Sequence, residues 1–320
     1  MQNHTKIWLL IAVIAIIAGS LIFLGVMTKL DWNFEKLSTV KYVTNTHTLT
    51  EEFNSIFIDT ETADIEILRA VDEECKVVCH EEEKIKHSVE IIDGELKVSV
   101  TDTRKWYEHI SFNFGTQKIT VYLPDSVYGS LKIQENTGDV TLANELKFNS
   151  ADLSLTTGKV NCLSDVAEEL KIKTNTGDVT VKDISVGALN LTLTTGSVTV
   201  NNVTVNNDIS VNLSTGKTKL IDVSCKNLTS EGSTGDAYLK NVIAEEKINI
   251  KRSTGNIKLE DSDARELYLK ASTGDIKGTL LTEKQFIADT DTGIKDVPNS
   301  TSGGRCEIET DTGNIVFSIK

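Results

Sequence analysis

The chain has 320 residues, a formal net charge of −14 and only two prolines. Such an excess of acid argues against nucleic acid, a bare anionic membrane surface or an anionic wall polymer as the partner, unless cations bridge the two. The scarcity of proline permits long runs of paired backbone, and the Thr, Val, Ile and Asn of the second half favour strands joined by tight turns.

The first predicted element is a membrane-spanning helix. Ile7 to Met27 contains 21 residues and no charge, and such a helix is roughly 31 Å long, enough to cross a hydrocarbon core of about 30 Å. Trp8 and Trp32 flank it as interfacial anchors do. A cleaved signal peptide is the alternative, because Ala18-Gly19-Ser20 resembles a cleavage site, but the apolar run continues beyond it. We predict an uncleaved anchor over residues 1–30 that contacts membrane lipid through Ile7 to Met27. The bulk of the chain is then extracytoplasmic, in a single-pass protein of the cell membrane.

Two less regular segments follow the anchor. Residues 31–50 are polar and rich in Thr and Asn, which predicts a tether, and residues 51–130 predict a β-rich entry or cap region. Terminal turns of a solenoid need a cover against open strand edges, so we expect this region to cover the first turn. Trp106 and Tyr107 lie within it. Its predicted pieces are a degenerate repeat turn with Ala63 in the Gly position (Ser55–Ile67), a strand (Cys75–Cys79), a hairpin around Asp93-Gly94 (Val89–Val100) and two strands (Ile110–Phe114 and Lys118–Leu123).

Residues 131–320 form a repeat array. The dipeptide Thr-Gly recurs ten times at intervals of 19 or 20 residues, and a fixed period in this range is typical of a solenoid. The glycine is explained by a corner that needs positive φ or leaves no room for a side chain. The predicted structural corner residues are Gly138, Gly158, Gly177, Gly196, Gly216, Gly235, Gly255, Gly274, Gly293 and Gly313.

Alternating apolar residues surround each corner. The residues five before and two after the glycine are mostly apolar, and period-two alternation points both columns toward one interior. Each turn therefore has two short strands bent at Thr-Gly and a third piece near Val203 and Val205. The predicted fold is all-β, a parallel β-solenoid or β-helix of about ten turns, in a rod roughly 48 Å long. The turn at Thr292-Gly293-Ile294 lacks the polar residue after Gly, and the segment after it predicts a loop or distorted turn near the C-terminal end.

Metal sites are weakly indicated. Acidic residues such as Asp139, Asp178 and Asp236 follow several corner glycines, and a column of them suggests structural calcium, but Lys159 and Lys217 interrupt the column. Asp and Asn are also ordinary turn residues, which is the interpretation we favour. We predict no cofactor, with structural calcium as the alternative.

The five cysteines are an odd number, so they do not form a fully paired intramolecular set. Cys162, Cys225 and Cys306 fall in inward columns and are interpreted as core residues. Cys75 and Cys79 lie roughly 13 Å apart on a straight strand, too far for a disulfide. With His80 and His87 they suggest zinc, but the spacing matches no standard site, so a plain strand is favoured and no metal ligand is predicted.

No catalytic motif is present in the sequence. Nucleophile elbows, HExxH and glycine-rich dinucleotide fingerprints are absent. All five histidines precede the array, and the constant period leaves no long loops to wall a substrate cleft. We therefore predict a protein that is not an enzyme and has no catalytic residues. Solenoid enzymes that act on polysaccharide do use Asp clusters with Lys or Arg, so a glycan-active enzyme stays an alternative.

The corners resemble a known family. Thr-Gly-Asp-Val at 137–140 and 176–179, Thr-Gly-Asp-Ile at 273–276, the Ile-Thr-Val-Tyr-Leu-Pro run at 119–124 and the Phe53, Ile56, Ile58 entry are similar to the bacterial putative-adhesin family of β-strand repeats, a domain of unknown function. The resemblance covers about residues 50–320. It implies an extracytoplasmic, membrane-tethered β-solenoid associated with envelope-stress signalling, and it implies no catalytic residues.

These observations predict a non-catalytic binding or interaction module of the bacterial cell envelope, in envelope-stress signalling or adhesion. Its expected partner is an envelope or membrane protein, and nucleic acid is not expected. A purely structural spacer is the third hypothesis.

Overall fold

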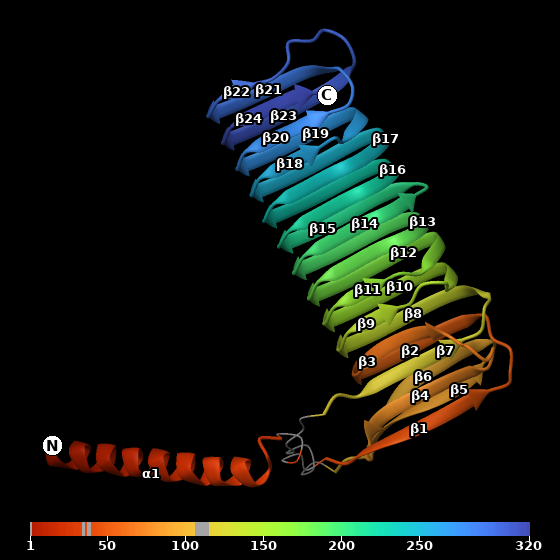
Figure 1. The fold of residues 1–320 in the computed structure, drawn as a ribbon, viewed down its shortest axis with the longest axis vertical. Coiled ribbons are helices and arrows are strands. Elements are labelled where there is room, and N and C mark those ends of the chain that lie inside the picture. The colour runs from red at the N-terminus through yellow and green to blue at the C-terminus, as the bar shows by residue number, and fades with distance from the viewer. Residues whose placement is uncertain (1, 34–35, 37–39, 106–114) are drawn as a thin grey trace.

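The structure is a computed structural model, and we describe residues 2–33, 36, 40–105 and 115–320 of it. One helix precedes a parallel β-solenoid whose layers stack into a rod (Figure 1). The predicted all-β solenoid with one N-terminal apolar helix is therefore confirmed. The predicted strand Ile110–Phe114 and the residues Trp106 and Tyr107 lie outside the described residues.

Helix α1 (Gln2–Lys29) contains the predicted apolar segment. Its stretch Thr5–Lys29 is long and apolar enough to cross a membrane, and none of its most apolar window is buried against the rest of the chain. Trp8 and Trp32 are both exposed. A signal sequence near the N-terminus can also be this long and apolar by the same test, so the helix by itself does not separate an anchor from a leader.

The strands divide into those of the cap and those of the array. The cap strands are β1 (Tyr42–Leu49), β2 (Ser55–Thr62), β3 (Asp64–Arg69), β4 (Cys75–Glu82), β5 (Ile85–Ile92), β6 (Glu95–Asp102) and β7 (Lys118–Leu123). The array strands are β8 (Val127–Thr137), β9 (Val140–Leu142), β10 (Lys147–Thr157), β11 (Val160–Cys162), β12 (Asp165–Thr176), β13 (Val179–Thr195), β14 (Val198–Val205), β15 (Asp208–Thr215), β16 (Thr218–Thr234), β17 (Ala237–Thr254), β18 (Ile257–Glu260), β19 (Asp263–Thr273), β20 (Ile276–Leu280), β21 (Lys284–Thr292), β22 (Lys295–Asp296), β23 (Gly304–Thr312) and β24 (Ile315–Ile319).

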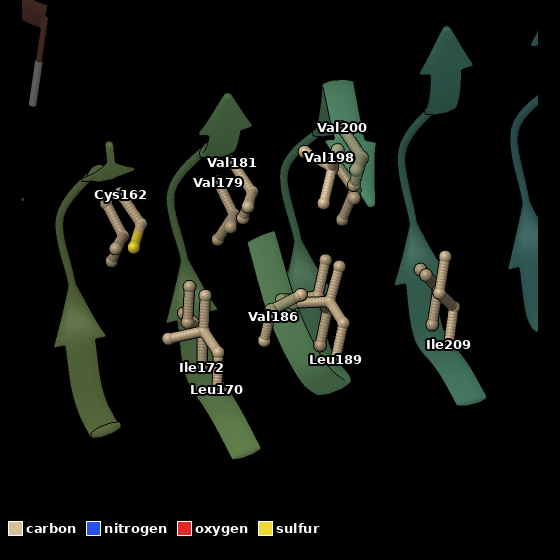
Figure 2. Packing of buried hydrophobic residues seen from close by; sticks show 14 of the residues in the cluster. Cys162, Leu170, Ile172, Val179, Val181, Val186, Leu189, Val198, Val200 and Ile209 are labelled. Carbon is tan, nitrogen blue, oxygen red and sulfur yellow. The ribbon is translucent and has the colours of Figure 1, made fainter. Parts of the chain in front are cut away.

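The core is a set of apolar columns, as predicted. Leu170 of one turn pairs with Leu189 of the next, and Leu189 pairs with Ile209 of the turn beyond; all three are at most 1% exposed. Figure 2 shows this column facing the column of Cys162, Val181 and Val200 across the interior. Because every turn repeats the same inward positions, identical backbone geometry brings like side chains into contact and one continuous core results.

Five consecutive turns have a second corner that was not predicted from the sequence. Six residues after the glycine, the backbone is left-handed at Asp183, Asn202, Asp222, Asn241 and Asp261, with φ between 49° and 56°. Asn and Asp adopt this conformation at lower cost than other residues with a side chain. Asn202 Nδ2 donates to Asp183 Oδ1 at 2.7 Å, and Asn241 Nδ2 donates to Asp222 Oδ1 at 2.8 Å. The predicted third piece, which contains Val203 and Val205, begins after this corner and is part of β14.

The cap begins with the degenerate repeat turn. β2 and β3 pair in parallel with β8 and β9, which places Ala63 beneath the Gly138 corner. β6 and β7 then pair with the other side of β2 and β3. The predicted hairpin is β5–β6, with Asp93 and Gly94 both at positive φ. The first repeat turn, β2 and β3, therefore lies inside the stack. The later strands β6 and β7 lie on its outer side.

Antiparallel strands close the N-terminal end. β4 pairs with β7, β5 pairs with β6, and β1 pairs with β4. The prediction of a tether over residues 31–50 is therefore wrong for Tyr42–Leu49, which is strand β1. The segment alternates half-buried and exposed side chains and supplies a partner for the free edge of β4, which explains why it does not remain a free tether.

The C-terminal turns stack out of chain order. β23 and β24 pair with β19 and β20 on one side and with β21 and β22 on the other. The turn that contains Gly293 is therefore outermost, and the chain returns through residues 297–303, where the sequence predicted a loop (Figure 1). The burial of side chains explains the order. Ile308 and Ile315 are at most 1% exposed and need neighbours on both sides, whereas Ala288 is half-buried and Lys295 is exposed.

Candidate functional site

The ten predicted glycines all lie at the corner between two strands, and they stack along one edge of the rod. At each step the glycine amide donates to the threonine carbonyl of the next turn, as in Gly196 N to Thr215 O at 3.0 Å and Gly216 N to Thr234 O at 2.8 Å. The threonine side chain before the glycine is exposed at all ten corners. The corner residues therefore act within the backbone ladder of the solenoid.

The acidic residue after the glycine accepts a hydrogen bond from the backbone of the next turn. Asp139 Oδ1 accepts from Lys159 N at 2.8 Å, and Asp236 Oδ1 accepts from Asn256 N at 2.9 Å. Asn256 Oδ1 accepts from the amide of the next turn in the same way, at 2.9 Å. An uncharged amide thus replaces the carboxylate without loss of the contact. This shared role accounts for Asp and Asn in the column without a calcium ion.

A hollow of about 510 Å³ lies on the face of the strands that precede the corner. We call it the array hollow. Its walls come from two outward columns of five successive turns. The column four residues before the glycine supplies Thr192, Asn212, Glu231, Lys251 and Lys270, and the column two residues before it supplies Thr194, Ser214, Ser233, Ser253 and Ser272. The surface is therefore rich in hydroxyl groups and carries ammonium groups, although the protein as a whole is acidic.

The floor of the array hollow lies where one turn has a glycine at an inward position. Gly232 occupies an inward column position held by Leu213 in the turn before and Arg252 in the turn after. The Arg252 side chain lies against Gly232, where a β-carbon would stand 3.3 Å from its Cδ and Cζ atoms. Arg252 is only 4% exposed. The missing side chain thus leaves the depression that Arg252 partly fills.

Arg252 is held by neutral oxygen atoms. Its Nη1 donates to the carbonyls of Ser230 and Lys251 at 3.0 and 2.8 Å, and its Nη2 donates to Thr218 Oγ1 and Ser230 Oγ at 3.0 and 2.9 Å. Burial lowers the pKa of the guanidinium to about 10, partly opposed by the charge of Asp236. Thr218 and Ser230 are the two polar residues that interrupt otherwise apolar inward columns in this part of the array, and Arg252 explains both.

Charged side chains at the rim of the array hollow are paired. Lys251 Nζ lies 3.4 Å from Glu231 Oε1, and Lys270 Nζ lies 2.8 Å from Glu309 Oε1. An adjoining hollow of about 300 Å³ shares these two lysines and adds Tyr268, whose ring carries Lys247 Nζ at 5.0 Å from its centroid. The combined surface offers hydroxyl, amide, ammonium and phenol groups. These groups suit a polar chain with many hydrogen-bonding groups, such as a glycan or an extended peptide.

A third hollow, of about 440 Å³, lies in the same columns at the cap end of the array. Asp59, Glu61, Glu135 and Lys173 are among its lining residues. Glu135 is only 4% exposed, and burial raises its pKa to about 7. Its Oε1 accepts from Thr137 N at 3.0 Å, whereas its buried Oε2 has no partner among the residues that the structure describes. A carboxyl in this setting is protonated at neutral pH to a large extent.

The residues considered for zinc are only partly brought together. His80 is exposed, stacks on Tyr42 and hydrogen-bonds Thr44 Oγ1 at 3.0 Å. Cys75 is buried at the far end of β4. Cys79 and His87 are neighbours in the cap interior, where Glu81 joins them. All five cysteines are buried and free, which agrees with the interpretation of Cys162, Cys225 and Cys306 as core residues.

Fold and surface together define a class: a β-solenoid with a capped N-terminal end, an apolar N-terminal helix and a polar hollow on one face. Residues 53–208 match the family described as Toastrack DUF4097. The chain resembles this family, as the corner motifs predicted. No curated protein matches the sequence.

Several solved structures are similar at low sequence identity. A putative adhesin from Bacteroides fragilis NCTC 9343 is 17% identical with a TM-score of 0.43, and the match covers 87% of this chain and 97% of the other. A putative lipid binding protein from Parabacteroides distasonis ATCC 8503 is 19% identical with a TM-score of 0.47, covering 73% and 94%. A putative adhesin from Parabacteroides merdae ATCC 43184 is 15% identical with a TM-score of 0.42, covering 74% and 96%.

Proposed function

We propose that this protein is a membrane-anchored, extracytoplasmic β-solenoid that acts as a non-catalytic binding module of the bacterial cell envelope, in adhesion or envelope-stress signalling. The array hollow is its binding surface. The observation that carries the proposal is this hollow, a polar depression built from five successive turns of a rigid rod. The expected partner is an envelope polymer or a membrane protein that presents an extended polar chain.

The apolar helix supports an anchor. Side chains along α1 such as Ile16, Leu21 and Ile22 are between 64% and 68% exposed. A stretch of this length has no apolar partner in the described chain, and lipid would supply one. The array extends away from the cap, which follows α1 in the chain (Figure 1). An anchor at this end would therefore hold the hollow away from the membrane surface.

The test is photo-crosslinking in the native membrane from one position inside the hollow and one outside it. A photoreactive residue at Ser253 samples the array hollow. The same residue at Asn161, an exposed position on β11, is the matched control on the other side of the corner. We expect capture of one discrete membrane protein or envelope polymer from position 253 and not from 161. A sensor or transporter would favour signalling, and a wall polymer would favour adhesion. Identical capture at both positions, or capture of copies of the protein alone, would contradict a binding role for the hollow.

Location is tested separately by proteolysis of intact cells. Cleavage of the array from the outside is expected for an extracytoplasmic protein. Protection of the array until the cells are lysed would rule this location out. A protein that fractionates without the membrane would contradict the anchor.

The glycan-active enzyme is the second candidate, and one observation favours it. Glu135 has a pKa of about 7 and shares the hollow at the cap end with Asp59 and Glu61, as an acid and its partner carboxylates do in glycosidases. However, the Oε1 atom of Glu135 accepts from the amides of Ala63 and Thr137, which holds the carboxyl in the wall. Release of sugars from envelope polysaccharide that is lost in Glu135→Gln would establish the enzyme.

A further inference from the structure

A compact group of side chains with metal-binding chemistry lies inside the cap. Cys79 and Glu81 occupy alternate positions on β4, so both point to the same side of the strand. His87 lies on β5, after the tight turn that joins the two strands. Cys79 and Glu81 are 0% exposed and His87 is 4% exposed. One ligand atom from each lies within 4.8 Å of the other two.

The contacts fix the orientation of the carboxylate and the imidazole. Glu81 Oε2 accepts from His87 N at 2.6 Å and lies 2.8 Å from His87 Nδ1, and Glu81 Oε1 accepts from Asn45 Nδ2 at 2.6 Å. On its other side, His87 Nε2 lies 3.1 Å from Thr60 Oγ1. A hydroxyl both donates and accepts, so Thr60 supports the imidazole whichever nitrogen carries the proton. Metal-binding histidines usually have such a partner on the second nitrogen.

An additional ring nitrogen nearby lacks a partner. His47 Nε2 is buried and has no hydrogen bond among the residues that the structure describes. His47 lies on β1, two residues from Asn45, and β1 pairs with β4 so that Asn45 is opposite Cys79 and His47 is opposite Val77. His47 is therefore two residues along β1 from the position opposite Cys79 and four from the position opposite Glu81, and it does not belong to the group of Cys79, Glu81 and His87.

We propose that Cys79, Glu81 and His87 form a binding site for Zn²⁺ that joins β4 and β5 in the cap, with a water molecule completing the tetrahedron. Sulfur, nitrogen and oxygen donors together suit zinc, whereas calcium and magnesium take oxygen ligands. Zinc lies about 2.0–2.3 Å from such atoms, which sets their separations near 3.3–3.8 Å in a tetrahedron. The Nδ1–Oε2 pair must therefore widen slightly from 2.8 Å.

The charges balance when the metal binds. The Cys79 thiol releases its proton to solvent, and the thiolate and the Glu81 carboxylate together neutralise the two positive charges of the ion. A buried site with no net charge avoids the desolvation cost that an unpaired anion would carry. The ion would bind only the folded cap, because the ligands come from two strands, β4 and β5. It would therefore stabilise the antiparallel strands that cover the end of the solenoid.

The experiment uses the full chain in detergent, stripped of metal with a chelator and titrated with Co²⁺ and then Zn²⁺. We expect one Co²⁺ per chain, with the sulfur-to-cobalt charge-transfer band and the intense visible bands of a tetrahedral site, and displacement of Co²⁺ by Zn²⁺. Cys79→Ser should remove the charge-transfer band and lower Zn²⁺ affinity at least about tenfold. Matched controls are Cys75→Ser, a buried thiol on the same side of β4, and His80→Gln, an exposed imidazole on the same strand. Both should bind as the unaltered protein does.

The wild-type titration is decisive even if Cys79→Ser fails to fold. Absence of stoichiometric Co²⁺ binding to the folded, metal-stripped protein would overturn the site. A charge-transfer band that persists in folded Cys79→Ser, or disappears in Cys75→Ser alone, would also overturn it. His87→Gln should lower Zn²⁺ affinity at least about tenfold, and an unchanged affinity in the folded variant would also overturn the site.

Discussion

The backbone carbonyl oxygen of Gly196 lies where a side chain of residue 216 would have to begin. A β-carbon built on Gly216 would stand less than 3.0 Å from this oxygen, and the Gly216 φ is 142°. The close approach arises because successive corners are joined by the hydrogen bond from Gly196 N to Thr215 O at 3.0 Å. The steric reason for the glycine column is therefore the spacing of the backbone ladder itself.

Gly216→Ala should be strongly destabilising for this reason. We expect a loss of more than about 3 kcal/mol, because the new methyl group meets backbone that cannot move without breaking the ladder. Gly94→Ala is the control, since Gly94 also has positive φ, at 77°, but open space around its Cβ position. It should cost about 1–2 kcal/mol. Thermal unfolding followed by circular dichroism measures both, and equal losses would contradict the steric explanation.

The side chains that follow the glycines accept hydrogen bonds from the next turn, so substitutions at Asp236 should destabilise the protein to different extents. Asp236→Ala removes the acceptor of the Asn256 amide and should cost about 1 kcal/mol. Asp236→Asn keeps an oxygen in place and should cost less than about 0.5 kcal/mol, because Asn256 already performs the same task in the next turn. Added Ca²⁺ should leave the melting temperature unchanged. A rise in melting temperature with Ca²⁺ that Asp236→Asn abolishes would instead show a calcium site.

Arg252 should be coupled to the two polar residues that it contacts. Arg252→Leu leaves Thr218 Oγ1 and Ser230 Oγ buried without this donor and should cost about 2–4 kcal/mol. Adding Thr218→Val and Ser230→Val to Arg252→Leu restores the apolar columns of neighbouring turns and should recover most of that loss. Hydrogen exchange of the Leu220 and Leu239 amides reports the local stability. Additive losses in the triple variant would show that the three residues are independent.

Glu135 should make stability depend on pH. Burial raises its pKa from 4.5 to about 7 in the folded protein. The folded chain then holds a proton that the unfolded chain releases, so the stability from this group is fully present below about pH 4.5 and is lost as pH rises through about 7.

Glu135→Gln removes this titration. The stability of the wild type relative to Glu135→Gln should therefore fall by on the order of 1–3 kcal/mol between pH 4 and pH 8. Urea denaturation at a series of pH values measures the difference. A difference that stays constant over this range would show that Glu135 titrates normally.

The core thiols should be unreactive in the folded protein. Burial raises the pKa of Cys162, Cys225 and Cys306 to about 12, so little thiolate exists at pH 8 and the sulfur atoms are also inaccessible. Iodoacetamide should label none of the three until denaturant is added, as mass spectrometry would reveal. An introduced thiol at Ser253→Cys, in the array hollow, should react in the folded state and serves as the positive control. Native labelling of Cys162 would contradict its place in the core.

The sequence predicted less of the candidate sites than of the fold. Ser230 and Thr218 appear in the sequence as interruptions of apolar columns, and Arg252 as a charge in an inward column, but their contact depends on the register between turns 22 and 34 residues apart. The spacing of Asp183, Asn202, Asp222 and Asn241 was visible in the sequence and would have revealed the second corner. The sequence did not indicate Glu81 as a metal ligand, because His80 directly follows Cys79 and was the residue considered with it.

The sequence by itself determined the apolar helix, the period of the array, the corner glycines and the direction of the core columns. These features depend on the alternation of apolar and polar residues and on steric limits within about one turn. The local sequence is therefore enough to predict them. Only the tertiary structure decided that β23 and β24 lie inside β21 and β22, that β1 completes the cap, and that Cys79, Glu81 and His87 meet. Every turn offers nearly the same edge to its neighbours. The order in which turns stack is therefore set by the arrangement that buries the most apolar side chains. That arrangement depends on the whole rod and not on any one turn.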